Sequence, residues 1–133
     1  MIGFVLVSHS SEIAKGTAEL IQQMAAGELE VSAVGGDASG SLGTDPDRIR
    51  AAIEGLDAGE VLVFMDIGSA VLSTETVFEM LEPEVAKKVR LVDAPFVEGA
   101  FAAAASASAG AGAEECVHTA MEARTEPKLH NEE

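Results

Sequence analysis

Residues 2–11 have the sequence IGFVLVSHSS, and their pattern carries the strongest information on the fold. Its first six residues form a continuous apolar run, which is typical of a strand buried on both faces of a sheet. Four polar residues, Ser8 to Ser11, interrupt the run, and apolar residues then recur at helical spacing from Glu12 to Met24. The stretch therefore predicts a strand, a polar loop and a helix, with Ser10 or Ser11 available to cap the first helical turn.

Strand-like and helix-like segments alternate through the rest of the chain. We expect three further strands, at Glu30–Val34, Val61–Met65 and Val89–Val92. We expect helices after the Asp45-Pro46 pair, from Ser69 to Pro83, and through the Ala-rich segment that is interrupted at Gly110 and Gly112 and ends near Arg124. Buried strands that alternate with helices pair in parallel through right-handed crossovers. The predicted fold class is therefore α/β, with a single doubly wound, mostly parallel sheet of four or five strands and helices on both faces.

The chain has the length of one domain. Of its 133 residues, 47% are hydrophobic, which is enough for one core but short of the length at which a second domain is expected. We assign residues 1–125 to this domain and expect residues 126–133 to form an acidic, disordered tail. No apolar stretch is long enough to span a bilayer, and the first residues lack the basic flank and cleavage site of a signal peptide. We therefore expect a cytoplasmic protein.

The charge of the chain excludes several classes of partner. The sequence has 23 acidic and 8 basic side chains, and its formal net charge is −15. Nucleic acid and anionic membrane surfaces would be repelled, whereas a protein with a basic docking face would be attracted. The single Cys116 cannot form an internal disulfide, and no second Cys or His pair at ligand spacing accompanies it. We therefore expect no metal site.

His9 is the first candidate catalytic residue. It directly follows the first predicted strand and precedes a helix N-terminus, where free backbone N–H groups and the helix dipole favour an anion. In an open α/β sheet the carboxyl ends of the strands form the ligand crevice. A neutral imidazole is a nucleophile, and a phosphohistidine can pass its phosphoryl group to another acceptor. His9 is therefore predicted to carry a phosphoryl group, although a single histidine in a loop is more commonly a solvated surface residue.

Asp66 is the second candidate catalytic residue. It follows the third predicted strand, which we expect to neighbour the first in a sheet whose strand order reverses between them. A carboxylate bonded to one ring N–H would fix the tautomer of His9 and leave the other nitrogen free to attack phosphorus. The alternative is that Asp66 caps the helix beginning at Ser69, a role it could fill at the same time.

Polar residues and glycines around His9 are candidates for holding the phosphoryl group. The segment Gly35–Thr44 carries four glycines, whose backbone N–H groups could surround phosphoryl oxygens as nests of amides do. Thr44 could add a hydroxyl group or belong to a plain turn. Neither a Walker sequence nor G-x-G-x-x-G follows the first strand, so we expect no nucleotide site and no bound cofactor in this chain. The predicted phosphate-binding residues are Ser10, Ser11, Gly43, Thr44, Gly68 and Ser69.

Three motifs carry a resemblance to a known family. They are FVLVSHS at residues 4–10, MDIGSA at residues 65–70 and DAPFVEGA at residues 93–100. In this order they resemble the phosphotransferase subunit of the phosphoenolpyruvate-dependent dihydroxyacetone kinase, which shares its fold with the mannose-type IIA components of sugar phosphotransferase systems. The resemblance extends from residue 2 to about residue 124. In one departure, Ser73 and Thr74 stand where family members often have an Asn.

The resemblance implies a role for the chain and for its two candidate catalytic residues. His9 would be phosphorylated by the phosphocarrier protein of the phosphotransferase system, and Asp66 would orient its ring. The phosphoryl group would pass to ADP on a nucleotide-binding dihydroxyacetone kinase subunit, so ADP and ATP are expected on the partner and not on this chain. The resemblance also implies a homodimer.

Three other interpretations of the sequence compete with this one. A response-regulator receiver domain is also doubly wound, but it needs an acidic pair after its first strand to bind magnesium, and this chain has Val7-Ser8-His9 there. A mannose-type IIA component, which would donate to a sugar permease, remains open. A non-catalytic interaction module, in which His9 and the loops are surface detail, also remains open.

Overall fold

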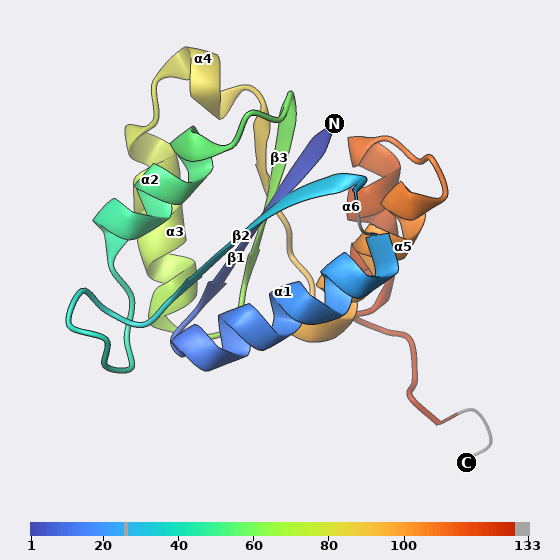
Figure 1. Cartoon of the computed structure of the whole chain (residues 1–133), viewed down its shortest axis with the longest axis horizontal. Coiled ribbons are helices and arrows are strands. Elements are labelled where there is room, and N and C mark those ends of the chain that lie inside the picture. The colour runs from blue at the N-terminus through green and yellow to red at the C-terminus, as the bar shows by residue number, and fades with distance from the viewer. Residues whose placement is uncertain (26, 130–133) are drawn as a thin grey trace.

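The protein is built around a sheet of four strands, all of them parallel (Figure 1). A computed structural model describes residues 1–25 and 27–129. The strands are β1 (Ile2–Ser8), β2 (Leu29–Gly35), β3 (Glu60–Met65) and β4 (Val89–Leu91). The helices are α1 (Ser11–Ala25), α2 (Pro46–Gly55), α3 (Ser69–Met80), α4 (Pro83–Ala86), α5 (Phe96–Ser108) and α6 (Ala113–Glu122).

The strand order β2-β1-β3-β4 confirms the predicted doubly wound α/β fold. From β1 the chain first moves outward to β2, and it then crosses back over β1 to form β3 and β4 on the other side. The order therefore reverses between β1 and β3, which is where such sheets place their ligands. Val7, at the end of β1, lies in register with Val34 of β2 and Met65 of β3. Within the described residues the sheet has four strands and no fifth.

Helices cover both faces of the sheet, and each face has its own hydrophobic cluster. Successive residues of a strand point to opposite faces, so the central strands divide their apolar side chains between the two clusters. On one face, α1, α5 and α6 pack against Phe4, Leu6, Leu62 and Phe64. On the other face, α2 and α3 pack against Val5, Val7, Val61 and Val63. A strand buried on both sides needs this continuous apolar sequence, as the first residues of the chain predicted.

The helix predicted from Ser69 to Pro83 is shorter than expected. It ends at Met80, and Pro83 begins a separate short helix, α4. Pro disfavours helical geometry in the residue before it, and Glu82 is extended, with ψ 146°. The Ala-rich segment forms two helices, α5 and α6, which are separated at Gly110 (φ 98°) as predicted.

Residues 126–129 lie beyond α6 on the surface. Residues 126–129, the described part of the predicted tail, are exposed, and the Lys128 ammonium group lies 3.3 Å from a Glu98 carboxylate oxygen. Residues 130–133, on which the rest of that prediction falls, are outside the described residues. In the part of the chain that the structure describes, no helix is long and apolar enough to cross a membrane.

Candidate active site

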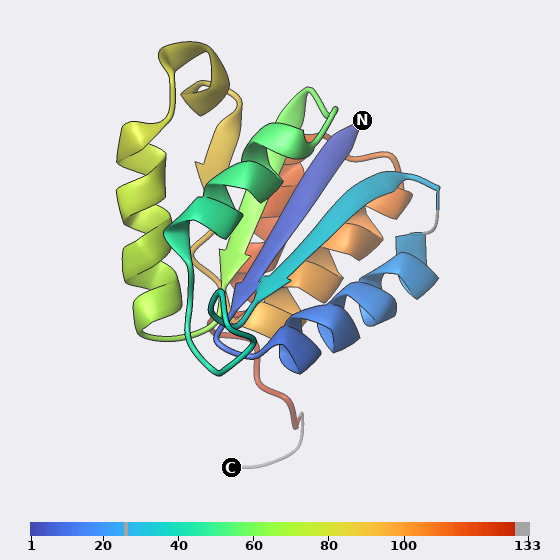
Figure 2. The ribbon, with the colours of Figure 1, turned by 60° about the vertical axis from the view of Figure 1, so that its left-hand side comes forward.

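Three loops meet at the carboxyl edge of the sheet, where Figure 2 shows the strand arrowheads converging. The Gly36 amide donates to the Ser8 carbonyl oxygen at 3.3 Å, and the Gly43 amide donates to the His9 carbonyl oxygen at 3.0 Å. The Asp66 amide donates to the Val7 carbonyl oxygen at 3.0 Å. These backbone bonds hold the loops after β1, β2 and β3 against one another.

The His9 ring lies against the Asp66 carboxylate. Its Nδ1 atom is 3.3 Å from Oδ1 of Asp66, and the His9 backbone amide donates to Oδ2 at 3.2 Å. An ionised carboxylate only accepts hydrogen bonds, so we assign the ring proton to Nδ1. The lone pair of the neutral imidazole then lies on Nε2. The His9 side chain is 28% exposed and that of Asp66 is 14% exposed, so the ring remains accessible while its partner is largely covered.

Several donors hold the Asp66 carboxylate in its ionised form. Ser8 donates its hydroxyl to Oδ2 at 2.7 Å, and the Ile67 amide donates to Oδ1 at 2.6 Å. Burial alone would raise the pKa of Asp66, but the hydrogen bonds from Ser8, Ile67 and His9 outweigh it and lower the pKa below its ordinary value. The carboxylate is therefore a permanent hydrogen-bond acceptor for the His9 ring at neutral pH.

Ser8 is a site residue that the sequence reasoning missed. It is 1% exposed, and its hydroxyl oxygen also accepts from the Ser10 amide at 3.0 Å. It thus connects Asp66 to the backbone of the His9 loop. The available signal was a hydroxyl side chain at the end of an otherwise apolar buried strand, because a buried polar group requires a partner.

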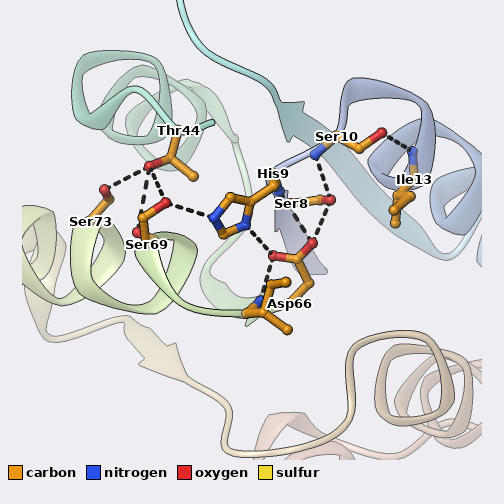
Figure 3. A network of polar contacts seen from close by, with 9 residues as sticks. Ser8, His9, Ser10, Ile13, Thr44, Asp66, Ser69 and Ser73 are labelled. Atoms are coloured by element: carbon orange, nitrogen blue, oxygen red, sulfur yellow. Dashed lines mark hydrogen bonds and ion pairs between the residues drawn. The ribbon is translucent and has the colours of Figure 1, made fainter. Parts of the chain in front are cut away.

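A chain of hydroxyl groups approaches the other ring nitrogen (Figure 3). The Ser69 hydroxyl oxygen lies 2.8 Å from His9 Nε2. Thr44, from the loop after β2, donates to the Ser69 oxygen at 3.2 Å, and its own oxygen lies 2.9 Å from that of Ser73. The predicted residues Thr44 and Ser69 are thus beside the ring, together with Ser73, which was not predicted as a site residue.

Gly68 and Ser69 place the N-terminus of α3 next to His9. Gly68 has φ +49°, and a Cβ atom added to it would lie 3.9 Å from His9 Nε2, so the backbone passes close to the ring. Among the described residues, the backbone amides of Gly68 and Ser69 have no hydrogen-bonding partner. Free amides at the start of a helix favour a bound anion.

Asp66 does not cap α3, so that alternative is wrong. Gly68 occupies the N-cap position and no side chain bonds the first turn. The carboxylate of Asp66 is directed instead at His9, Ser8 and the neighbouring Ile67 amide.

Two of the remaining predicted residues use their polar groups within the protein. Ser10 accepts a hydrogen bond from the Ile13 amide at 3.2 Å and so caps α1, as predicted. The Gly43 amide is bonded to the His9 carbonyl oxygen, so in this conformation it is not available to a phosphoryl oxygen. Ser11 packs against Gly35, where an added Cβ atom would lie 2.5 Å from the Ser11 Cα atom.

The Gly-rich loop is held by its own side chains and does not form an open nest of amides. The Asp37 carboxylate accepts from the Ser39 amide and hydroxyl and from the Ser41 amide, at 2.8 to 2.9 Å. Arg48 donates to the carbonyl oxygens of Gly35 and Gly36 at 3.1 and 3.2 Å. The loop is therefore fixed as a wall of the site.

An open cleft of about 490 Å³ adjoins Asp66 on the side of β4. Three carboxylates line it, from Asp66, Glu75 and Asp93. Because these charges repel an anion, a phosphoryl group is favoured on the opposite side of the ring, where Ser69 and the N-terminus of α3 lie. Within the described residues, no group of three or more His, Cys, Asp or Glu side chains is placed to hold a metal ion.

Comparisons with known proteins agree with this architecture. The EIIA-man family, described as PTS system fructose IIA component, matches residues 3–117. The chain is 46% identical over 127 residues to the PEP-dependent dihydroxyacetone kinase, phosphoryl donor subunit DhaM, of Klebsiella michiganensis, covering 92% of this chain and 27% of that protein. It is 44% identical over 105 residues to the PEP-dependent dihydroxyacetone kinase 2, phosphoryl donor subunit DhaM, of Listeria innocua, covering 78% of this chain and 84% of that protein.

A solved structure has the same fold over nearly the whole chain. The crystal structure of the protein EF1359, described as of unknown function, superposes with a TM-score of 0.89 and 42% sequence identity, covering 97% of this chain and 98% of that one. The chain spans about a quarter of the length of the Klebsiella relative but most of the length of the Listeria relative. The match over residues 3–117 and the identity to relatives of similar length show that the chain belongs to the EIIA-man family and is similar to DhaM subunits.

Proposed function

We propose that this protein accepts a phosphoryl group on Nε2 of His9 and passes it to ADP on a partner subunit. The donor would be the phosphocarrier protein of the phosphoenolpyruvate phosphotransferase system, and the acceptor a nucleotide-binding dihydroxyacetone kinase subunit. One observation carries the proposal: the His9 ring has Asp66 on Nδ1 and a hydroxyl group on Nε2, at an accessible edge of the sheet.

The first transfer forms a bond between His9 Nε2 and phosphorus. The Nε2 lone pair attacks, and the bond from phosphorus to the nitrogen of the donor breaks, with its electron pair returning to the donor. The ring keeps its Nδ1 proton and gains positive charge, which the neighbouring Asp66 carboxylate stabilises at 3.3 Å. In the second transfer, an oxygen of the terminal phosphate of ADP attacks phosphorus, and the electron pair of the broken bond returns to Nε2.

The start of α3 would stabilise the phosphoryl oxygens. The Ser69 hydroxyl lies 2.8 Å from Nε2, the backbone amides of Gly68 and Ser69 have no partner among the described residues, and the helix dipole adds positive potential at this terminus. We place the phosphoryl group at these donors. In this proposal Ser10 and Gly43 only support the loops.

The proposal places the nucleotide on the partner and gives this chain no cofactor. It also includes a homodimer in the cytoplasm. Support for a second copy comes from large apolar side chains that are at least 38% exposed on α1 and α5, which are Ile13, Leu20, Met24, Val97 and Phe101. Sedimentation of the purified protein at several concentrations tests the dimer.

Transfer to a sugar permease component is the second candidate. It is favoured by the family match, whose description is that of a sugar phosphotransferase component. Both candidates use the same chemistry at His9 and differ only in the acceptor.

One experiment distinguishes the two acceptors. The protein is labelled with radioactive phosphate from phosphoenolpyruvate and the two general phosphotransferase proteins, and is then added separately to an ADP-loaded kinase subunit and to a mannose-type permease component. We expect label in ATP or its product only in the first mixture. Label that reaches only the permease would replace the kinase acceptor with the sugar one, and absence of labelling in the first step would overturn both.

A further inference from the structure

Three hydroxyl groups form a continuous line that ends on His9 Nε2. Ser69 and Ser73 lie four residues apart on α3, and therefore on one face of the helix. Thr44 reaches between them from the loop after β2. The oxygen–oxygen distances are 2.9 Å from Ser73 to Thr44 and 3.2 Å from Thr44 to Ser69, and the Ser69 oxygen is 2.8 Å from Nε2.

The Asp66 carboxylate fixes the direction of every hydrogen bond in this line. It accepts from Nδ1 of His9, so Nε2 has no proton and accepts from the Ser69 hydroxyl. A hydroxyl has one proton, so the Ser69 oxygen in turn accepts from Thr44. The Thr44 proton is then committed, and the 2.9 Å contact is a bond that Ser73 donates.

The competing arrangement for Thr44 is less favourable. Its hydroxyl also lies 3.5 Å from the Ser69 carbonyl oxygen, which is longer than the 3.2 Å to the Ser69 side chain and at the limit of a hydrogen bond. Because neighbouring hydrogen bonds in a chain polarise one another, donation from Ser73 strengthens the donation from Thr44 to Ser69.

We propose that Thr44 and Ser73 are positioning residues, which hold the Ser69 hydroxyl on Nε2 of His9 through this one-way line of donors. The inference rests on the proposed function of His9 and adds Ser73 to its site. It also changes the role expected for Thr44, from a phosphate ligand to a residue that acts through Ser69.

The arrangement has a consequence for phosphoryl transfer. In the resting site, the Ser69 hydroxyl occupies the lone pair with which Nε2 attacks phosphorus. When the bond from Nε2 to phosphorus forms, Ser69 must turn aside and donate to a phosphoryl oxygen, and that new bond is charge-assisted. A Ser69 side chain held by Thr44 is already beside this position, whereas one released from Thr44 is free to turn toward solvent.

Thr44→Val tests the proposal, because valine has nearly the same shape and removes only the hydroxyl. We expect the rate of phosphoryl uptake to fall by about two- to tenfold, as for loss of one neutral hydrogen bond. Ser73→Ala should act in the same direction with a smaller effect. Thr44→Ser restores the hydroxyl and should recover most of the rate. The matched control is Thr76→Val, which removes a hydroxyl from α3 that bonds only the Leu72 carbonyl oxygen at 3.0 Å.

A second measurement does not depend on phosphoryl transfer. In isotope-labelled protein, the nitrogen NMR shifts of the His9 ring report which nitrogen carries the proton and how strongly Nε2 accepts. We expect the Nε2 shift of Thr44→Val to move toward that of an unbonded ring nitrogen, while Thr76→Val leaves it unchanged.

The outcomes separate failure of this inference from failure of the proposed function. If the wild-type protein takes up no phosphate but the Nε2 shift still changes in Thr44→Val, the hydroxyl line stands and the transfer role falls. A wild-type rate and an unchanged Nε2 shift in Thr44→Val would overturn the positioning role. Faster uptake in this variant would also overturn it, since the hydroxyls would then restrain the nucleophile instead of preparing it.

Discussion

His9 is the residue on which the proposed chemistry depends, and replacing it should remove that chemistry alone. Its ring is partly exposed and lies outside both hydrophobic clusters. We expect the wild-type protein to gain one acid-labile, base-stable phosphate per chain and His9→Ala to gain none, with an unchanged melting temperature. The control is His118→Ala, since His118 is an exposed residue of α6 paired with Glu122 at 3.3 Å. Full labelling of His9→Ala would contradict the assignment.

Asp66 should control both the rate of transfer and the stability of the protein in acid. Asp66→Asn removes the charge that stabilises the ring as it gains positive charge, so we expect phosphoryl uptake at neutral pH to slow by at least tenfold. An isosteric amide keeps much of the packing. The increase in the activation free energy of transfer should therefore exceed any decrease in the free energy of unfolding. Equal rates for the variant and the wild type would assign Asp66 a purely structural role.

The pH dependence of unfolding gives an independent test of Asp66. Burial raises the pKa of Asp66, but hydrogen bonds from Ser8, Ile67 and His9 lower it by more. The folded-state pKa is therefore below the ordinary value of 3.8. A lowered folded-state pKa stabilises the protein above the unfolded-state pKa, and this contribution is lost as pH falls through the folded-state pKa. Below about pH 4, the free energy of unfolding should therefore fall more steeply in the wild type than in Asp66→Asn, as measured by denaturant titrations at each pH.

The sequence predicts that His9 and Asp66 lie at one edge of the sheet, because each follows a strand. Ser8 and Ser73 were missed for different reasons. The sequence places Ser8 in a polar loop, whereas in the structure it ends a buried strand and its side chain is buried. The role of Ser73 depends on the path of a loop that brings Thr44 to α3, and no local pattern encodes that contact.

The end of β2 is in close backbone contact with the start of α1 at Gly35. A Cβ atom there would overlap the Ser10 carbonyl oxygen and lie 2.5 Å from the Ser11 Cα atom, and both contacts are with backbone. Gly35→Ala should therefore move the His9 loop or destabilise the protein by about 1–3 kcal/mol, the usual range for overpacking. Denaturant unfolding measures the stability, and Gly59→Ala, where an added Cβ atom meets nothing within 4 Å, is the control.

Thr74 is a buried residue of α3 whose hydroxyl group lacks a hydrogen-bonding partner among the described residues. Its exposed fraction is 0%. An unsatisfied buried hydroxyl costs stability, so Thr74→Val, which keeps the shape, should raise the free energy of unfolding by about 1 kcal/mol. Destabilisation by this change would show that the hydroxyl has a partner, such as a bound water.

The order and type of the long helices and strands could be predicted from the sequence, but not all of their ends could. The apolar run of β1 and the Asp45-Pro46 start of α2 are local signals, and the structure confirms both predictions. Leu81 is the C-cap of α3 and packs into the core, and Glu82 is extended before Pro83, which begins α4. The apolar spacing of the sequence, in contrast, predicts a helix that continues through Leu81 to Pro83.

The net negative charge of the protein acts on any partner that approaches His9. With a formal net charge of −15, it should attract a partner whose nucleotide site is surrounded by basic residues. Such attraction acts mainly on the rate of encounter and is screened over about 8 Å at physiological ionic strength. Its effect should therefore depend on where a charge lies, and not only on how many there are.

Two exposed glutamates allow this dependence on position to be measured. Glu75 lies on α3 beside the cleft next to Asp66, whereas Glu60 begins β3 at the opposite edge of the sheet. Glu75→Gln and Glu60→Gln change the net charge equally, but only Glu75 lines the cleft that adjoins Asp66. At low salt we expect Glu75→Gln to slow the second-order transfer to the kinase subunit by about twofold or more, with Glu60→Gln close to the wild type. High salt should slow the wild type and bring the three rates together. Equal rates at low salt, or a wild-type rate that rises with salt, would exclude electrostatic steering of the partner to this edge.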